Sequence, residues 1–276
     1  MGAVAAIQMV SGSDLTANLR EVSQLLKQAA EQGAALAVLP ENFALLDSPA
    51  LRALAEHEQE EQGIERFLRE QARQLGIWIV AGSVPRLDAG RGEVAAPRVR
   101  SACLVLDSDG ELQARYDKVH LFDVQVDDAH GAYRESDLVE AGDELVLVET
   151  PLGKLGLTIC YDLRFPEQFM RLREQGAQLI TVPSAFTYVT GQAHWEVLLR
   201  ARAIETQCYL IGANQGGRHS ASRETWGQSM VVDGNGTVLA QRAQGAGVVT
   251  APVDLAALDE LRRRMPVLAH RQQAGF

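Results

Sequence analysis

Short apolar runs and helically spaced apolar positions alternate along the first third of the chain. Residues 3–10 and 36–39 are almost entirely apolar, which is typical of strands buried on both faces. Between them, apolar residues recur every three or four positions over residues 15–30. The same spacing returns over residues 64–75, before another apolar run at 77–84. The order strand, helix, strand, helix, strand predicts an α/β fold in which helices cover a parallel or mixed sheet.

Hairpin patterns dominate the middle of the chain. Strand-like runs flank turn sequences such as Asp107-Ser108-Asp109-Gly110, which predicts hairpins at residues 101–116, 145–159 and 227–240. Further helices are predicted over residues 167–174, 193–207 and 255–265, and further strands over 179–182, 208–213 and 248–253. Similar elements recur in the two halves, which weakly indicates internal pseudo-symmetry.

Three segments have neither pattern and are predicted to be loops. Residues 40–48 follow the strand that Pro40 stops, residues 88–98 are rich in Gly, Ala and charge, and residues 119–143 are long and polar. Loops as long as the last are usually functional or disordered in compact domains. No change of composition marks a linker, so we expect residues 1–276 to form a single domain.

The composition narrows the class of protein and its partners. The 276 residues are 46% hydrophobic and 22% charged, which fits a globular chain with a sizeable core. A net charge of −10 and an isoelectric point of about 5.1 argue against nucleic acid or an anionic membrane as partner. Three cysteines are too few and odd in number for a disulfide framework, and the N-terminus lacks the basic start of a signal peptide. We therefore expect a cytoplasmic protein.

Three polar residues with complementary chemistry directly follow strand-like runs. They are Glu41, Lys118 and Cys160. Residues at strand ends line the ligand crevice of open sheets, so side chains from distant parts of the chain can meet there. A carboxylate can accept the proton of a thiol, and an ammonium can stabilise the charge of a tetrahedral intermediate. This trio suits attack on an amide or nitrile carbon, followed by acyl transfer to water.

Each member of the trio also has a plain structural interpretation. Cys160 could be a small buried hydrophobe, Glu41 a carboxylate at a helix N-terminus and Lys118 a surface lysine. Competing chemistries lack their motifs: the sequence has no Cys-x-x-Cys, no zinc-binding pair of histidines, no phosphate-binding glycine loop and no Gly-x-Ser-x-Gly. We therefore expect neither a metal nor a cofactor.

Three stretches around these residues carry a family resemblance. They are Leu39-Pro40-Glu41-Asn42, the segment from Tyr116 to Asp123 and the segment from Cys160 to Glu167. In this order they resemble the signatures of the nitrilase (carbon–nitrogen hydrolase) superfamily, and the match spans nearly the whole chain. The resemblance implies a four-layer α-β-β-α sandwich that pairs with a second copy across its helices, as a homodimer or a higher homo-oligomer.

The resemblance also implies roles for individual residues. Glu41 would deprotonate Cys160 and later activate water, and Cys160 would attack the amide carbon of a small-molecule substrate. Lys118 and the backbone N–H of Tyr161 would hold the oxyanion, and Glu135 matches the family's second glutamate, which positions Lys118 or substrate. Without the family resemblance, Glu135 would be interpreted as a solvated charge in a loop.

Residues 183–186 and 193–207 resemble the branch of the superfamily that contains deaminated glutathione amidases and omega-amidases. Two departures from the branch pattern, Gln192 and Gln228, are expected near the pocket and bear on the choice of substrate. Arg164 and Arg218 are candidate partners for a carboxylate of the substrate, because a guanidinium can bind a carboxylate in a bidentate manner. The residues that the resemblance places at the substrate are Tyr161, Arg164, Phe186, Thr190 and Arg218.

These observations leave several hypotheses open. The leading one is an amidohydrolase that converts deaminated glutathione into α-ketoglutarate and cysteinylglycine. An omega-amidase that acts on α-ketoglutaramate or α-ketosuccinamate is the alternative within the same chemistry. A non-catalytic binding protein on the same fold is the alternative of another class, and a thiol redox protein would need Cys103 or Cys208 to pair with Cys160.

Overall fold

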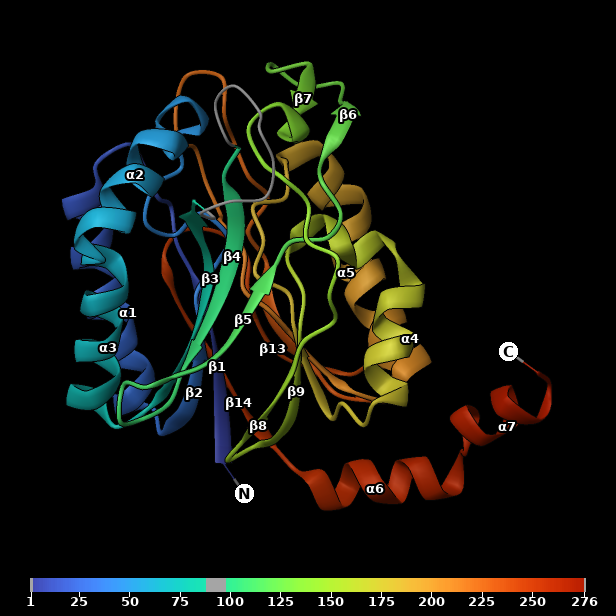
Figure 1. Cartoon of the computed structure of the whole chain (residues 1–276). Coiled ribbons are helices and arrows are strands. Elements are labelled where there is room, and N and C mark those ends of the chain that lie inside the picture. The colour runs from blue at the N-terminus through green and yellow to red at the C-terminus, as the bar shows by residue number, and fades with distance from the viewer. Residues whose placement is uncertain (1, 88–97, 276) are drawn as a thin grey trace.

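The computed structural model describes residues 2–87 and 98–275, and two six-stranded sheets pack face to face within them. The first sheet has the order β14-β1-β2-β3-β4-β5 and the second the order β13-β12-β11-β10-β9-β8. Helices cover the outer face of each sheet, so the molecule has the four α-β-β-α layers that were predicted (Figure 1).

The strands of the first sheet are β1 (Gly2–Gln8), β2 (Ala34–Val38), β3 (Trp78–Arg86), β4 (Arg100–Leu106), β5 (Leu112–Asp117) and β14 (Gly247–Val253). Those of the second sheet are β8 (Leu147–Thr150), β9 (Gly153–Leu157), β10 (Leu179–Thr181), β11 (Tyr209–Gly212), β12 (Ser229–Val232) and β13 (Val238–Arg242). In each sheet three parallel strands, β1-β2-β3 or β9-β10-β11, are flanked by antiparallel ones. The two sheets therefore repeat one pattern, in agreement with the pseudo-symmetry that the sequence indicates.

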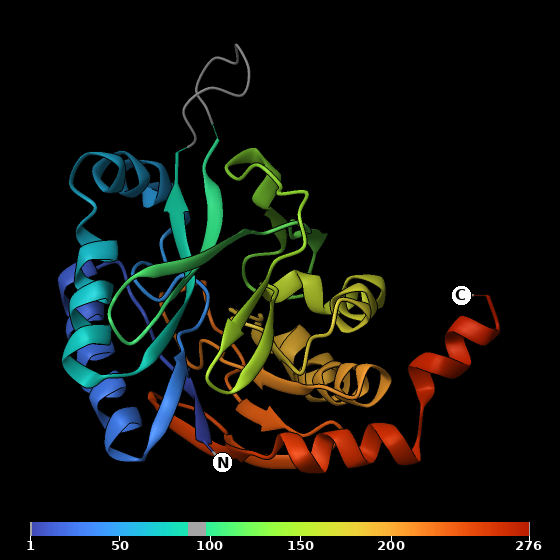
Figure 2. The same cartoon turned by 60° about the horizontal axis from the view of Figure 1, so that its bottom comes forward.

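Helices α1 (Leu15–Glu31), α2 (Leu51–Glu61) and α3 (Gly63–Leu75) cover the first sheet, and α4 (Pro166–Glu174) and α5 (Tyr188–Thr206) cover the second (Figure 1). Helix α6 (Leu255–Arg264) contacts this body through the buried Leu258 and through Arg262, which donates to Gln207 O, and α7 (Val267–Gln273) lies farther out (Figures 1 and 2). No helix in the described part of the chain is long and apolar enough to span a membrane.

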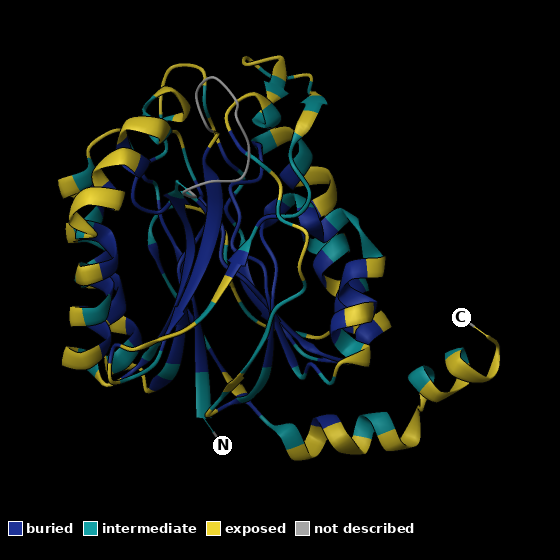
Figure 3. Cartoon of the chain, in the orientation of Figure 1, coloured by how far each residue is buried: buried dark blue, intermediate teal, exposed yellow. Residues whose placement is uncertain are grey.

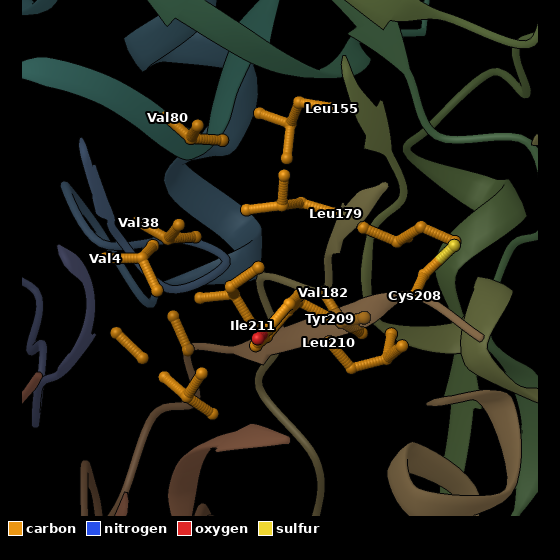
Figure 4. Close-up of a cluster of buried hydrophobic side chains, with 14 of the residues drawn as sticks. Val4, Val38, Val80, Leu155, Leu179, Val182, Cys208, Tyr209, Leu210 and Ile211 are labelled. Carbon is orange, nitrogen blue, oxygen red and sulfur yellow. The ribbon is translucent and has the colours of Figure 1, made fainter. Parts of the chain in front are cut away.

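The main hydrophobic core lies between the two sheets, where burial is densest (Figure 3). Val4, Val38 and Val80 from the first sheet belong to the same buried cluster as Leu155 and Leu179 from the second (Figure 4). Strands that are covered by a helix on one face and by the other sheet on the second face have no solvent side. This is why their sequences are continuous apolar runs instead of alternating ones.

The predicted elements are largely observed, with differences in the connections. Helix α2 was not predicted, and α5 begins at Tyr188 instead of residue 193. The side chain of Thr187 caps α5 by accepting from Thr190 N, although Gly191 weakens the helical pattern there. The predicted loop at 119–143 contains the short pair β6 (Asp123–Gln125) and β7 (Ala132–Arg134). The predicted loop at 88–98 falls almost entirely on residues 88–97, which lie outside the described residues.

Candidate active site

Glu41, Lys118 and Cys160 converge although they lie far apart in the sequence. Glu41 follows β2, Lys118 follows β5, and Cys160 opens a short 3-10 helix, η3 (Cys160–Arg164), after β9. The Nζ atom of Lys118 lies 2.7 Å from Oε1 of Glu41 and 2.8 Å from Oε1 of Glu135, which opens the 3-10 helix η2 (Glu135–Asp137). All four residues line one cavity of about 440 Å³.

The turn at Cys160 has an unusual backbone conformation. Its φ is 49°, in the left-handed region that non-glycine residues rarely adopt, and its N–H donates to Pro183 O at 2.8 Å. Such a conformation costs on the order of 1 kcal/mol and persists where surrounding contacts enforce it. The chain leaves β9 sharply at this residue, and the side chain of Cys160 lines the cavity instead of continuing the strand.

The carboxylate of Asp162 holds this turn in place through hydrogen bonds. It is fully buried, and it accepts hydrogen bonds from Tyr116 Oη at 2.6 Å, from Ile159 N at 2.8 Å and from His120 N at 3.0 Å. Tyr116 and His120 flank Lys118 in the sequence. One buried carboxylate thus connects the segment that carries the ammonium to the turn that carries the thiol.

The buried charges of the site shift one another's protonation. Burial alone lowers the pKa of Lys118, but the carboxylates of Glu135 and Glu41 hold it well above its ordinary value. Burial and the charge of Glu41 raise the pKa of the Cys160 thiol, against the opposing effect of Lys118. Burial raises the pKa of Glu135, while Lys118 lowers it. The resting site therefore holds a charged ammonium and a neutral thiol beside a carboxylate able to accept its proton.

Four of the five residues predicted at the substrate line the cavity: Tyr161, Arg164, Phe186 and Thr190. The guanidinium carbon of Arg164 lies 5.4 Å from the ring centre of Phe186 and 5.8 Å from that of Tyr161. This places a cation on an aromatic wall of the cavity, where it can meet an anionic group of a ligand.

Arg218, the fifth residue, is not among the residues that line this cavity. Its side chain is 70% exposed, and its Nη2 lies 3.9 Å from Oε2 of Glu224. The two residues belong to the same loop, where their backbones form a single antiparallel β-bridge. Gln192 is exposed on α5, and Gln228 bonds to Glu196 and Trp226, so neither lines the cavity. The predicted effect of these two glutamines on substrate choice therefore does not involve lining the cavity, and it stays a prediction.

Several lining residues were not predicted to contact the substrate, although Phe122 lies within the signature from Tyr116 to Asp123. Phe122 and Tyr133 come from the long polar segment, and Arg223 comes from the irregular chain between β11 and β12. The ring of Phe122 meets that of Tyr161 edge-on, with centres 5.1 Å apart. Among the described residues no group of three His, Cys, Asp or Glu side chains could hold a metal ion.

The geometry of a thiol, a carboxylate and an ammonium in one cavity agrees with the family assignment. The model of the carbon-nitrogen hydrolase family matches residues 3–263, so the chain belongs to that family. It is accordingly a hydrolase of carbon–nitrogen bonds other than peptide bonds.

Individual relatives narrow the likeness further. A deaminated glutathione amidase from Yersinia enterocolitica is 45% identical over 270 residues, which cover 98% of this chain and 92% of that protein. The crystal structure of the Caenorhabditis elegans NitFhit protein superposes with a TM-score of 0.89 at 40% identity, covering 100% of this chain and 66% of that one. Saccharomyces cerevisiae Nit3, a member of branch 10 of the nitrilase superfamily, superposes with a TM-score of 0.85 at 30% identity, covering 96% and 94%.

Proposed function

We propose that this protein is a deaminated glutathione amidase in which Glu41, Lys118 and Cys160 form the catalytic triad and Glu135 positions Lys118. The observation that carries the triad is the ammonium of Lys118, buried between Glu41 at 2.7 Å and Glu135 at 2.8 Å in the cavity that Cys160 also lines. The substrate is supported by the name of the Yersinia relative and by the cationic and aromatic lining of the cavity.

The first half of the reaction forms a thioester. Glu41 accepts the proton of the Cys160 thiol while the sulfur attacks the amide carbon, and the carbonyl oxygen becomes an oxyanion. Protonation of Glu41 weakens its hold on Lys118, whose ammonium then stabilises the oxyanion together with the backbone N–H of Tyr161. Glu41 passes the proton to the amide nitrogen, the carbon–nitrogen bond breaks, and the amine leaves.

The second half returns the enzyme to its resting state. Glu41, again a carboxylate, accepts a proton from a water molecule while the oxygen of that water molecule attacks the thioester carbon. The carbon–sulfur bond breaks, the sulfur recovers the proton, and the acid product leaves. With deaminated glutathione the products are cysteinylglycine from the first half and α-ketoglutarate from the second.

The proposal is tested by comparing kcat/KM for deaminated glutathione and α-ketoglutaramate. We expect the wild-type protein to prefer deaminated glutathione and Cys160→Ala to be inactive on both. A clear preference for the smaller amide would make the protein an omega-amidase. Hydrolysis of either amide by Cys160→Ala would refute the thioester mechanism, and a wild type inactive on both would favour the non-catalytic binding protein.

We further propose a cytoplasmic homodimer of single-domain chains. Helix α5 presents Val197, which is 67% exposed, and Ile204, which is 50% exposed, on the outer face of the sandwich. Exposed apolar side chains on an outer helix support association through that helix. The three free cysteines support a reducing compartment.

A further inference from the structure

A second guanidinium, that of Arg223, lines the catalytic cavity without a carboxylate partner. Its carbon lies 4.9 Å from the ring centre of Tyr133, and its Nη2 donates to Ala185 O at 3.3 Å. Within residues 2–87 and 98–275, no carboxylate oxygen approaches it to 4.0 Å. Arg223 thus provides a half-buried positive charge at the edge of the site.

Two more deeply shielded arginines of the described chain have carboxylate partners, whereas the half-buried Arg262 donates to the backbone carbonyls of Gln207 and Ala177. Arg86 lies 2.5 Å from Glu65, and Arg202 lies 3.0 Å from Glu205. A guanidinium that is partly removed from water normally requires such a partner, because desolvation of a charge is costly. The absence of one at Arg223 leaves room for an anionic group of a ligand.

An acidic side chain between β6 and β7 does not fill that place. Asp128 attracts Arg223 at longer range, but its oxygens already accept from Tyr133 Oη at 2.9 Å, from Gly131 N at 2.9 Å and from His130 N at 3.0 Å. These contacts bind Asp128 to the β6–β7 segment. The guanidinium keeps donors that its contact with Ala185 does not use.

Arg223 also lies between the catalytic cavity and a second hollow of about 220 Å³, since it lines both. Tyr188, Ser220 and the exposed Arg218 are among the residues that line the second hollow. The space available to a ligand therefore continues past Arg223. Arg164, by contrast, lies in the same short helix as Cys160 and lines the catalytic cavity alone.

Deaminated glutathione carries a carboxylate at each end, one on its acyl part and one on the amine that leaves. The larger part of the molecule is the leaving dipeptide, which requires the larger space. We propose that Arg223 binds the terminal carboxylate of the leaving amine and so selects amides of amino acids and short peptides over simple ω-amides. This inference rests on the proposed function for the identity of the substrate, and it assigns Arg164 to the acyl carboxylate.

The test compares two substrates that differ only at the leaving end: deaminated glutathione and its analogue with a terminal carboxamide. One charge-assisted contact supplies roughly a 10–100-fold difference, so we expect the wild type to prefer the carboxylate by about that factor in kcat/KM. Arg223→Gln should bring the ratio close to one, and Arg223→Lys should restore part of it. Hydrolysis of α-ketoglutaramate, whose leaving group is ammonia and carries no carboxylate, should fall less in Arg223→Gln than hydrolysis of deaminated glutathione.

The control is Arg20→Gln, which removes the same charge from an exposed position on α1 and should leave the ratio unchanged. A wild-type ratio near one, or an equal loss on all three substrates in Arg223→Gln, would overturn the inference. A second measurement separates it from the proposed function: calorimetric binding of both analogues to Cys160→Ala, with and without Arg223→Gln. If binding shows the preference and the wild type does not hydrolyse deaminated glutathione, Arg223 retains its role and the proposed function fails.

Discussion

The thiol of Cys160 is kept neutral by the residues around it. Burial and the charge of Glu41 raise its pKa, and Lys118 opposes them without reversing the shift. Because only the thiolate attacks a carbonyl carbon, a thiol in this state depends on a base that removes its proton during the attack. The pKa shift thus explains why the proposed mechanism requires Glu41 as well as Cys160.

The variant Glu41→Gln separates the charge of Glu41 from its role as a base. Removal of the carboxylate charge lowers the pKa of Cys160, since Glu41 raises it and Lys118 remains in place. We expect the midpoint of the pH dependence of iodoacetamide alkylation at Cys160 to move to lower pH. Amide hydrolysis should fall by roughly 10²–10⁴-fold, the usual contribution of a general base.

The control for this measurement is Lys118→Met. Because Lys118 lowers the pKa of Cys160, its removal should move the midpoint to higher pH. A midpoint that moves in the same direction in both variants would contradict the electrostatic account. The other two cysteines are fully buried, so mass spectrometry should find the label at Cys160 alone.

At the scale of elements, the site depends on how strand ends are held together. Asp162 joins the end of β5 and the chain after it to the turn after β9 through four hydrogen bonds that originate from both segments. Asp162→Asn replaces one carboxylate oxygen with an amide NH₂ group. This group cannot accept the hydrogen bonds that the neighbouring N–H and O–H groups donate. We expect a loss of about 3 kcal/mol in the free energy of unfolding, measured by urea denaturation.

The same variant should lower kcat more than it raises KM. The distance between the thiol of Cys160 and the ammonium of Lys118 changes, while the other residues that line the cavity stay in place. The matched control is Asp123→Asn, because the side chain of Asp123 is exposed and accepts from Ser136 N. It should unfold at the same urea concentration as the wild type. Equal stability of Asp162→Asn and the wild type would rule out this positioning role.

Strand β3 must pass unusually close to the end of β2. A Cβ atom at Gly82 would lie 2.1 Å from Pro40 O and 2.4 Å from Leu39 O, immediately before Glu41. Since both neighbours are backbone, Gly82→Ala must displace the segment that carries the base. We expect a loss of roughly 1–3 kcal/mol in the free energy of unfolding, together with lower activity.

Gly12→Ala provides the comparison, because a Cβ atom there would meet no heavy atom within 4 Å. Its thermal midpoint and kcat should match those of the wild type. Full activity of Gly82→Ala would show that the β2–β3 approach does not control the position of Glu41.

At the scale of the whole molecule, the proposed dimer places α5 at the interface. Val197→Asp introduces a charge at the most exposed large apolar side chain of that helix in the described chain. We expect light scattering to show a mass close to that of one 30.0 kDa chain instead of two. Leu112→Asp, at an exposed position on β5, should leave the dimer intact, and a dimer that survives Val197→Asp would place the interface elsewhere.

The sequence by itself determined most strands, most of the covering helices and the trio of candidate catalytic residues, while the four-layer arrangement came from the family resemblance. Continuous apolar runs identify strands that have no solvent face, and helical spacing identifies the covering helices, because both patterns depend on local geometry. Glu41, Lys118 and Cys160 were found because each follows a strand-like run and because each lies within a family signature. The tertiary structure then brought Lys118 to 2.7 Å from Glu41 in a shared cavity.

Only the tertiary structure decided which loop residues line the cavity. Arg218 was predicted there and Arg223 was not, yet Arg223 lines the cavity and Arg218 does not. Both lie in an irregular segment whose backbone has no period, so residue spacing cannot tell which side chain points inward. Contacts with distant parts of the chain, such as the bond from Arg223 to Ala185 O, determine that choice, and a pattern along the sequence cannot contain them.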